Sequence, residues 1–151
     1  MKKFIITILI FCSIITFSGQ SQAKMKDKTI VKNNIQKERI TVVKKAKKML
    51  GVPYVWGGES KTGADCSGLT RLAYRSINVF LPHFAYAQMQ LGKWINGKFL
   101  RPGDLLFYHN GGHVALYIGN GRMIHASSYY GQTIHAPLRG GWDEARRILY
   151  S

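Results

Sequence analysis

The C-terminal half of the chain is divided by glycine turns into short segments of strand character. After Arg101, β-branched, aromatic and aliphatic residues gather in four runs, at 105–108, 113–118, 122–126 and 132–136. The turns between them contain Gly111-Gly112, Gly119-Asn120-Gly121 and Gly131. Segments this close together can pair only as antiparallel neighbours, because a parallel crossover needs about a dozen residues or more. The pattern therefore predicts a meander of antiparallel strands.

Helical periodicity precedes these strands. Apolar residues repeat with helical spacing over 42–50, opposite a lysine-rich face, and Gly51 ends the pattern. Two further helices are expected, one from Cys66 to Ile77 and one following Pro82 as far as Leu91. Residues 52–58 combine a proline with paired glycines, so they should be extended and enter a tight turn. Helices followed by strands indicate an α+β fold, and residues 41–151 are long enough for one domain.

The first 23 residues have the pattern of a secretory signal peptide. Lys2 and Lys3 precede an apolar run over 4–17, and the small-residue sequence Ser21-Gln22-Ala23 follows. We expect cleavage after Ala23 and export to the periplasm or to the extracellular cell wall. Cys12 raises the alternative of a lipoprotein anchor, but Phe11 stands where lipoprotein signals place a small residue.

A basic, flexible lead-in is expected over residues 24–40. The chain has a formal net charge of +15, and Lys24 to Lys48 holds ten basic residues but only two acidic ones. Such a segment is either a solvated approach to the domain or a contact to an anionic cell-wall polymer or membrane surface. No nucleic-acid partner is expected, because export argues against one and no base-stacking or groove-entering motif accompanies the charge.

Cys66 would be the only cysteine left after signal cleavage. It follows Asp65, a good N-cap residue, and so falls in the first turn of a helix. Unpaired N–H groups and the helix dipole at that position are expected to lower the thiol pKa. A lone cysteine is more commonly a buried packing residue, and only a nearby base would favour a nucleophile.

Two histidines can supply that base. If Ile118 pairs with Arg122 in a hairpin, Ala115 lies opposite His125, and His113 becomes its diagonal neighbour on the same sheet face. His113 would then take the proton of Cys66, and His125 would orient the His113 ring. A metal site formed by the same three side chains is a weaker alternative. The remaining histidines are expected to be structural: His83, His109 and His135.

Several motifs together resemble the NlpC-type family of papain-like cell-wall cysteine peptidases. They are "GVPYVWGGESKTGADCSGLTRLAY", "LP", "RPGDLLFY" and "HVALYIGNGRMIHA", which span most of the chain between Val42 and Ala136 in this order. The resemblance implies a nucleophile helix packed on an antiparallel sheet that bears the base. Ala115 departs from the glycine frequent at that position in the family.

The resemblance also implies roles for individual residues. Cys66 would be the nucleophile, His113 the general base and His125 the polar third member of the site. Tyr54 would act near the thiol and the oxyanion, and Asp65, Ser67 and Trp56 would contribute to substrate binding. The implied reaction is hydrolysis of the bond between γ-D-glutamate and a diamino acid, diaminopimelate or lysine, in peptidoglycan stem peptides.

Other functions fit the same residues. An amidase or an acyltransferase could use this site on another exported amide or lipid, and a cell-wall-binding module without catalysis would require a decayed site. We expect a monomer that uses no cofactor and no metal.

Overall fold

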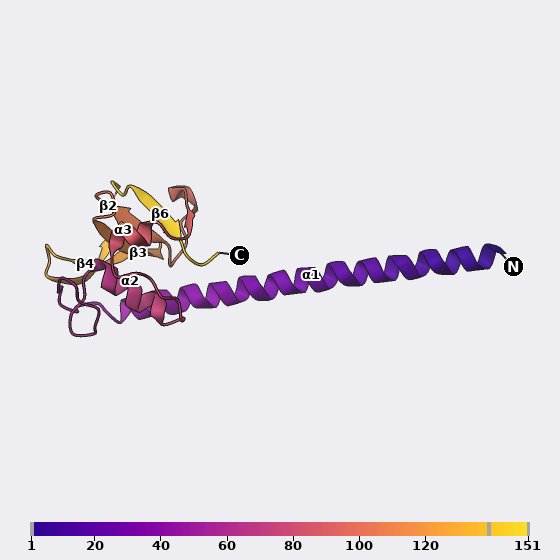
Figure 1. Cartoon of the computed structure of the whole chain (residues 1–151), viewed down its shortest axis with the longest axis horizontal. Coiled ribbons are helices and arrows are strands. Elements are labelled where there is room, and N and C mark those ends of the chain that lie inside the picture. The colour runs from indigo at the N-terminus through magenta and orange to yellow at the C-terminus, as the bar shows by residue number, and fades with distance from the viewer. Residues whose placement is uncertain (1, 139, 151) are drawn as a thin grey trace. The chain divides into compact units, whose positions relative to one another are not determined.

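A six-stranded antiparallel sheet organises the C-terminal part of the chain (Figure 1). In this computed structural model, residues 2–138 and 140–150 are described, with side chains from residue 22 onward. The strand order is β1-β6-β2-β3-β4-β5. The strands are β1 (Lys93–Trp94), β2 (Leu105–Tyr108), β3 (His113–Gly119), β4 (Arg122–Ser127), β5 (Gln132–Pro137) and β6 (Glu144–Arg147). The predicted meander is confirmed as β2 to β5, and the fold is of the α+β class.

The sequence did not predict two of the strands, β1 and β6. β6 reads Glu-Ala-Arg-Arg, and its alternation is visible only in the structure, where Ala145 and Arg147 are buried and their neighbours are half-buried. β6 lies between β2 and β1 and pairs with both, so it extends the sheet beyond the meander. Charged residues concealed this pattern, because a buried arginine cannot be distinguished from an exposed one in the sequence.

Both faces of the sheet carry buried apolar side chains. On one face, Leu106 is packed with Ala115, Met123 and Ala145. The alternate residues point to the opposite face and are completely buried: Leu105, Phe107, Val114, Leu116 and Ile124. Each large side chain buried in this way stabilises the fold by about 1.5–3 kcal/mol. The core is therefore built on the central strands that also carry the two histidines.

Two short helices pack against this sheet. α2 (Cys66–Arg75) contacts β3 and β4, and α3 (Ala85–Met89) contacts α2, β2, β3 and β6 (Figure 1). α2 begins where the capping pattern predicted. α3 is shorter than the expected helix, because Phe84 is still extended and forms its N-cap. A short 3-10 helix, η1 (Gly97–Phe99), follows β1.

The longest helix, α1 (Lys2–Lys47), belongs to two structural units. Residues 2–35 form one unit, and Gln36 to Tyr150 form the other. Within the second unit, Val42, Ala46 and Met49 are buried, as the helical pattern over 42–50 predicted. The helix also continues upstream through the basic lead-in. Among the described residues, no helix combines the length and hydropathy needed to cross a membrane.

A buried carboxylate joins the end of α1 to the sheet. Asp104 is fully buried and receives hydrogen bonds from Arg147 Nε and Nη2, at 2.9 and 2.7 Å. Arg39 Nη1 donates to the same carboxylate at 3.2 Å and to the carbonyl of Pro102 at 3.0 Å. Arg39 lies within the expected lead-in, so at least this lead-in residue packs with the domain. We call these residues the Asp104 network.

Candidate active site

Cys66 is the first residue of α2 and is only 8% exposed. Asp65 precedes it with extended backbone angles, φ −88° and ψ −178°, and its side chain accepts a hydrogen bond from the Gly68 N–H at 2.7 Å. This is the expected N-cap, which satisfies one of the unpaired amides at the helix start. The cap fixes where the helix begins and therefore where the thiol lies.

The Asp65 carboxylate also binds groups outside the helix. It accepts hydrogen bonds from Ser67 Oγ at 2.9 Å, from the Gly57 N–H at 2.9 Å and from His83 Nε2 at 3.2 Å. One side chain thus joins the turn at Gly57, the first turn of α2 and the segment before α3. We call these residues the Asp65 network.

Glycines let the turn approach the helix closely. A Cβ atom added to Gly68 would lie 2.1 Å from the Gly58 carbonyl oxygen, which is closer than any real contact. The same oxygen accepts a hydrogen bond from the Asp65 N–H at 3.0 Å. Gly57 has φ +69°, a conformation that glycine adopts without strain. The glycines on either side of Cys66 are therefore explained by backbone contact beside the thiol.

The pKa of the Cys66 thiol is raised, which differs from the sequence prediction. Burial is the main cause, and the charge of Asp65 raises it further. The N–H groups of Ser67 and Cys66 itself lower the pKa, as expected at a helix start, and the Val114 N–H on β3 lowers it more, but together they do not outweigh burial. The thiol is thus protonated at rest, and a base is needed to ionise it.

The two predicted histidines are in direct contact. His113 Nε2 and His125 Nδ1 lie 2.9 Å apart and form a hydrogen bond. The register around them is the expected one, since Leu116 pairs with Ile124, although Arg122 pairs with Gly119 and not with Ile118. A bulge between Tyr117 and Gly119 absorbs the extra residue, so the error in the hairpin loop does not reach the histidines.

Burial keeps both imidazoles neutral. It lowers the pKa of His113 to about 4, with further contributions from His125 and His109. It also lowers the pKa of His125. A neutral His125 can accept the Nε2 proton of His113, which leaves Nδ1 of His113 without a proton and able to act as a base. The pair can therefore orient and maintain a neutral base.

Every predicted site residue lines one pocket of about 590 Å³. The residues are Cys66, His113, His125, Tyr54, Trp56, Asp65 and Ser67. Burial raises the pKa of Tyr54, and the nearby charges of Cys66 and Asp65 raise it further, so its hydroxyl remains a hydrogen-bond donor. Trp56 is 86% exposed at the pocket. The structure thus brings together residues that are up to 71 positions apart in the sequence.

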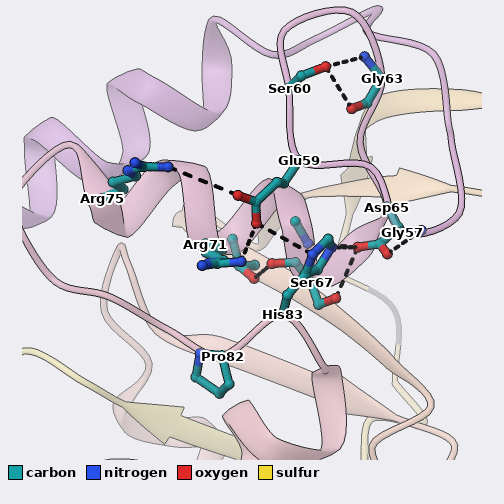
Figure 2. A network of polar contacts seen from close by, with 12 residues as sticks. Gly57, Glu59, Ser60, Gly63, Asp65, Ser67, Arg71, Arg75, Pro82 and His83 are labelled. Carbon is teal, nitrogen blue, oxygen red and sulfur yellow. Dashed lines mark hydrogen bonds and ion pairs between the residues drawn. The ribbon is translucent and has the colours of Figure 1, made fainter.

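Two histidines that we expected to be structural also line the pocket, His83 and His109. His83 bridges two carboxylates, because its Nδ1 lies 3.4 Å from Glu59 Oε2 while its Nε2 donates to Asp65 (Figure 2). Arg71 also binds Glu59, as Figure 2 shows. The available sequence signal was weak: a polar residue within the apolar run from Phe80 to Phe84.

The third histidine lies elsewhere. His135 is exposed on β5 and accepts a hydrogen bond from Arg122 Nε at 2.7 Å. In the described part of the chain, no group of three His, Cys, Asp or Glu side chains is arranged to hold a metal ion. The alternative metal site considered from the sequence, formed by Cys66, His113 and His125, is thus not one of these arrangements.

Known proteins resemble this chain in sequence and in fold. The chain is 35% identical over 137 residues to peptidoglycan endopeptidase RipB of Mycobacterium tuberculosis, covering 81% of this chain and 57% of RipB. It is 38% identical over 107 residues to murein DD-endopeptidase MepS/murein LD-carboxypeptidase of Escherichia coli K12, covering 66% and 57%. The chain therefore spans somewhat more than half the length of these relatives.

Solved structures agree with the sequence relatives. A structure of RipB superposes with a TM-score of 0.74 at 34% identity, covering 79% of this chain and 68% of that one. The P60 domain of an M. avium subspecies paratuberculosis antigen gives a TM-score of 0.72 at 34% identity, covering 78% and 99%. Residues 51–148, which include the whole pocket, match the NlpC/P60 family. The chain belongs to the NlpC/P60 family.

Proposed function

We propose that this protein is a secreted peptidoglycan hydrolase, a cysteine endopeptidase that uses Cys66, His113 and His125. The proposal is carried by one observation: a thiol at a capped helix start shares a pocket with a neutral histidine pair. Two relatives bear the names of a peptidoglycan endopeptidase and a murein endopeptidase, which supports the substrate class.

The reaction begins with transfer of the thiol proton to His113. Nε2 of His113 is engaged by His125, so Nδ1 is the nitrogen that accepts it. The raised thiol pKa and the lowered imidazole pKa favour a neutral pair at rest, so ionisation accompanies substrate attack. His125 holds the ring in this tautomer and acts as a positioning residue.

The thiolate then attacks the amide carbonyl and forms a tetrahedral intermediate. Its oxyanion is stabilised by the Cys66 N–H and by the Tyr54 hydroxyl. The C–N bond breaks as protonated His113 gives its proton to the leaving amine, which leaves an acyl-enzyme. Water, deprotonated by His113, attacks this thioester, and the carboxylic acid and the thiol are released. No cofactor takes part.

The bond that we propose joins γ-D-glutamate to a diamino acid, diaminopimelate or lysine, in the stem peptide. Asp65 and Ser67 lie on the acyl side of that bond, and Trp56 contributes to the substrate surface. An amidase or an acyltransferase would release different products from defined muropeptides. A binding module without catalysis would release none.

We propose export directed by residues 1–23, to the periplasm or the cell wall, and action there as a monomer. The basic lead-in, residues 24–40, gives modest attachment to anionic cell-wall polymer or membrane surface. A variant beginning at Gln36, which lacks most of the lead-in but keeps Arg39 of the Asp104 network, should sediment less with cell envelopes at low salt than the chain beginning at Lys24. Equal sedimentation of the two forms would argue against attachment.

Substitution of the nucleophile tests the proposed activity. Cys66→Ala and His113→Ala should each abolish release of stem-peptide fragments from purified peptidoglycan, because they remove the nucleophile and the base. His135→Ala is the matched control, since this histidine lies outside the pocket, and it should retain activity. Mass spectrometry of the products identifies the bond. Fragment release by Cys66→Ala would disprove the mechanism.

A further inference from the structure

Three large aromatic side chains surround the pocket and remain open to solvent. Trp56, Phe84 and Tyr129 line the pocket and are 86%, 61% and 88% exposed. They come from three separate segments: the turn before α2, the residue before α3 and the connection between β4 and β5. Exposed aromatic groups gathered at one site indicate an interaction surface. We call these three residues the aromatic rim.

The aromatic surface continues beyond the pocket. The Phe84 ring lies 6.2 Å from that of Tyr86, and the Tyr129 ring lies 4.9 Å from that of Tyr130, between ring centroids. Tyr86 and Tyr130 are themselves exposed and do not line the pocket. A ligand on this surface can therefore extend beyond the pocket over either aromatic pair.

The polar groups at the rim are mostly uncharged or already engaged. Among the described residues that line the pocket, none is Lys, Arg or Glu. Asp65 is occupied by its own network, and His83 lies between two carboxylates. The hydroxyl group of Ser128 is exposed beside Tyr129, whereas Ser127 is buried and its Oγ accepts a hydrogen bond from the Tyr130 N–H at 3.3 Å. The chemistry suits a neutral ligand with flat apolar faces and hydroxyl groups, and it does not suit an anionic polymer.

We propose that the aromatic rim binds sugar rings of the glycan strand to which the stem peptide is attached. Pyranose rings present flat C–H faces that stack on aromatic rings, and their hydroxyl groups can pair with the exposed hydroxyl of Ser128. A stem peptide of small and charged residues offers little apolar surface for three exposed rings. This binding site rests on the proposed function and adds a second substrate group to it: the peptide reaches Cys66 while the glycan lies on the rim.

Two matched substrates test the inference. One is a soluble muropeptide that keeps its sugars, and the other is the same stem peptide without sugars. Trp56→Ala and Tyr129→Ala should each lower kcat/KM for the sugar-bearing substrate by about tenfold, mainly through KM, as expected for loss of one stacking contact. Tyr129→Ala should cleave the sugar-free peptide at the wild-type rate, and Trp56→Ala should lose more activity on the sugar-bearing substrate than on the sugar-free one. Trp94→Ala and Phe99→Ala are controls, because both aromatic residues are exposed but lie outside the pocket.

A binding measurement makes the test independent of cleavage. A short β-1,4-linked N-acetylglucosamine oligomer, titrated into Cys66→Ala and followed by NMR, should shift the indole signal of Trp56 but not that of Trp94. Equal losses on both substrates, or no shift at Trp56, would overturn the glycan site. Failure of the wild type to cleave either substrate, with the Trp56 shift present, would instead overturn the proposed hydrolase activity.

Discussion

The Asp65 and Asp104 networks both place one carboxylate at the centre of several hydrogen-bond donors, but they connect different parts of the molecule. Asp104 is fully buried and pairs with two arginines, which join α1 to β6. Asp65 lies at the pocket and receives two backbone N–H groups, a hydroxyl and an imidazole. The first network closes the fold, and the second positions the Cys66 thiol. Both carboxylates are buried, so burial does not distinguish them. Their hydrogen-bond partners do: those of Asp104 stabilise the fold, and those of Asp65 organise the pocket.

The largest effect is expected in the Asp104 network. Asp104→Asn leaves Arg39 and Arg147 buried without a counter-charge, which should lower the free energy of unfolding by about 4 kcal/mol. Urea denaturation measures this loss. The activity of the folded fraction should be nearly unchanged, since Asp104 does not line the pocket. A variant that unfolds like the wild type but loses activity would reverse the roles assigned to the two networks.

Acid should weaken the fold through the pocket, because burial keeps His113 neutral there. His113 has a pKa of about 4 in the folded protein, compared with 6.5 when unperturbed. The unfolded chain therefore binds more protons between these values, and the free energy of unfolding falls by about 3 kcal/mol as pH drops from about 6.5 to about 4. Denaturation across this range should show a smaller fall for His113→Gln. An identical fall would assign the acid sensitivity to other groups.

Loss of the Asp65 carboxylate should affect activity more than stability. Asp65→Ala removes the helix cap and should lower the free energy of unfolding by about 2 kcal/mol. It also releases the Gly57 turn, so kcat/KM should fall by more than the fraction unfolded explains. Asp65→Asn keeps a capping oxygen and should recover most of the stability. If activity recovers in parallel with stability, Asp65 acts only as a cap.

The smallest effect is expected at His83, which supports Asp65 from outside the helix. His83→Ala should lower kcat/KM and the rate of Cys66 alkylation by roughly tenfold, the size of one lost charged hydrogen bond. His83→Arg should restore both, because a guanidinium can donate to Glu59 and Asp65 together. Failure of Arg to restore the alkylation rate would indicate that the imidazole shape matters more than its two donors.

Local sequence patterns predicted much of the fold and gathered the candidate site. Asp65 and the helical spacing placed Cys66 at the start of α2, and strand periodicity placed His113 and His125 on one face of the sheet. The hairpin loop was wrong by one residue at Ile118, but the bulge confined that error to the turn. β6 was missed because its buried residues include an arginine.

The sequence alone determined the start of α2, the meander and the shared sheet face of His113 and His125, because these depend on periodicity and on neighbours within a few residues. The tertiary structure decided the direction of the Cys66 pKa, the neutral state of the histidine pair, the insertion of β6 and the place of His83 between Glu59 and Asp65. Each of these depends on burial or on contact between segments distant in the chain. Solvent exclusion around the thiol outweighs the local effect of the helix start, and that balance exists only once the fold has formed.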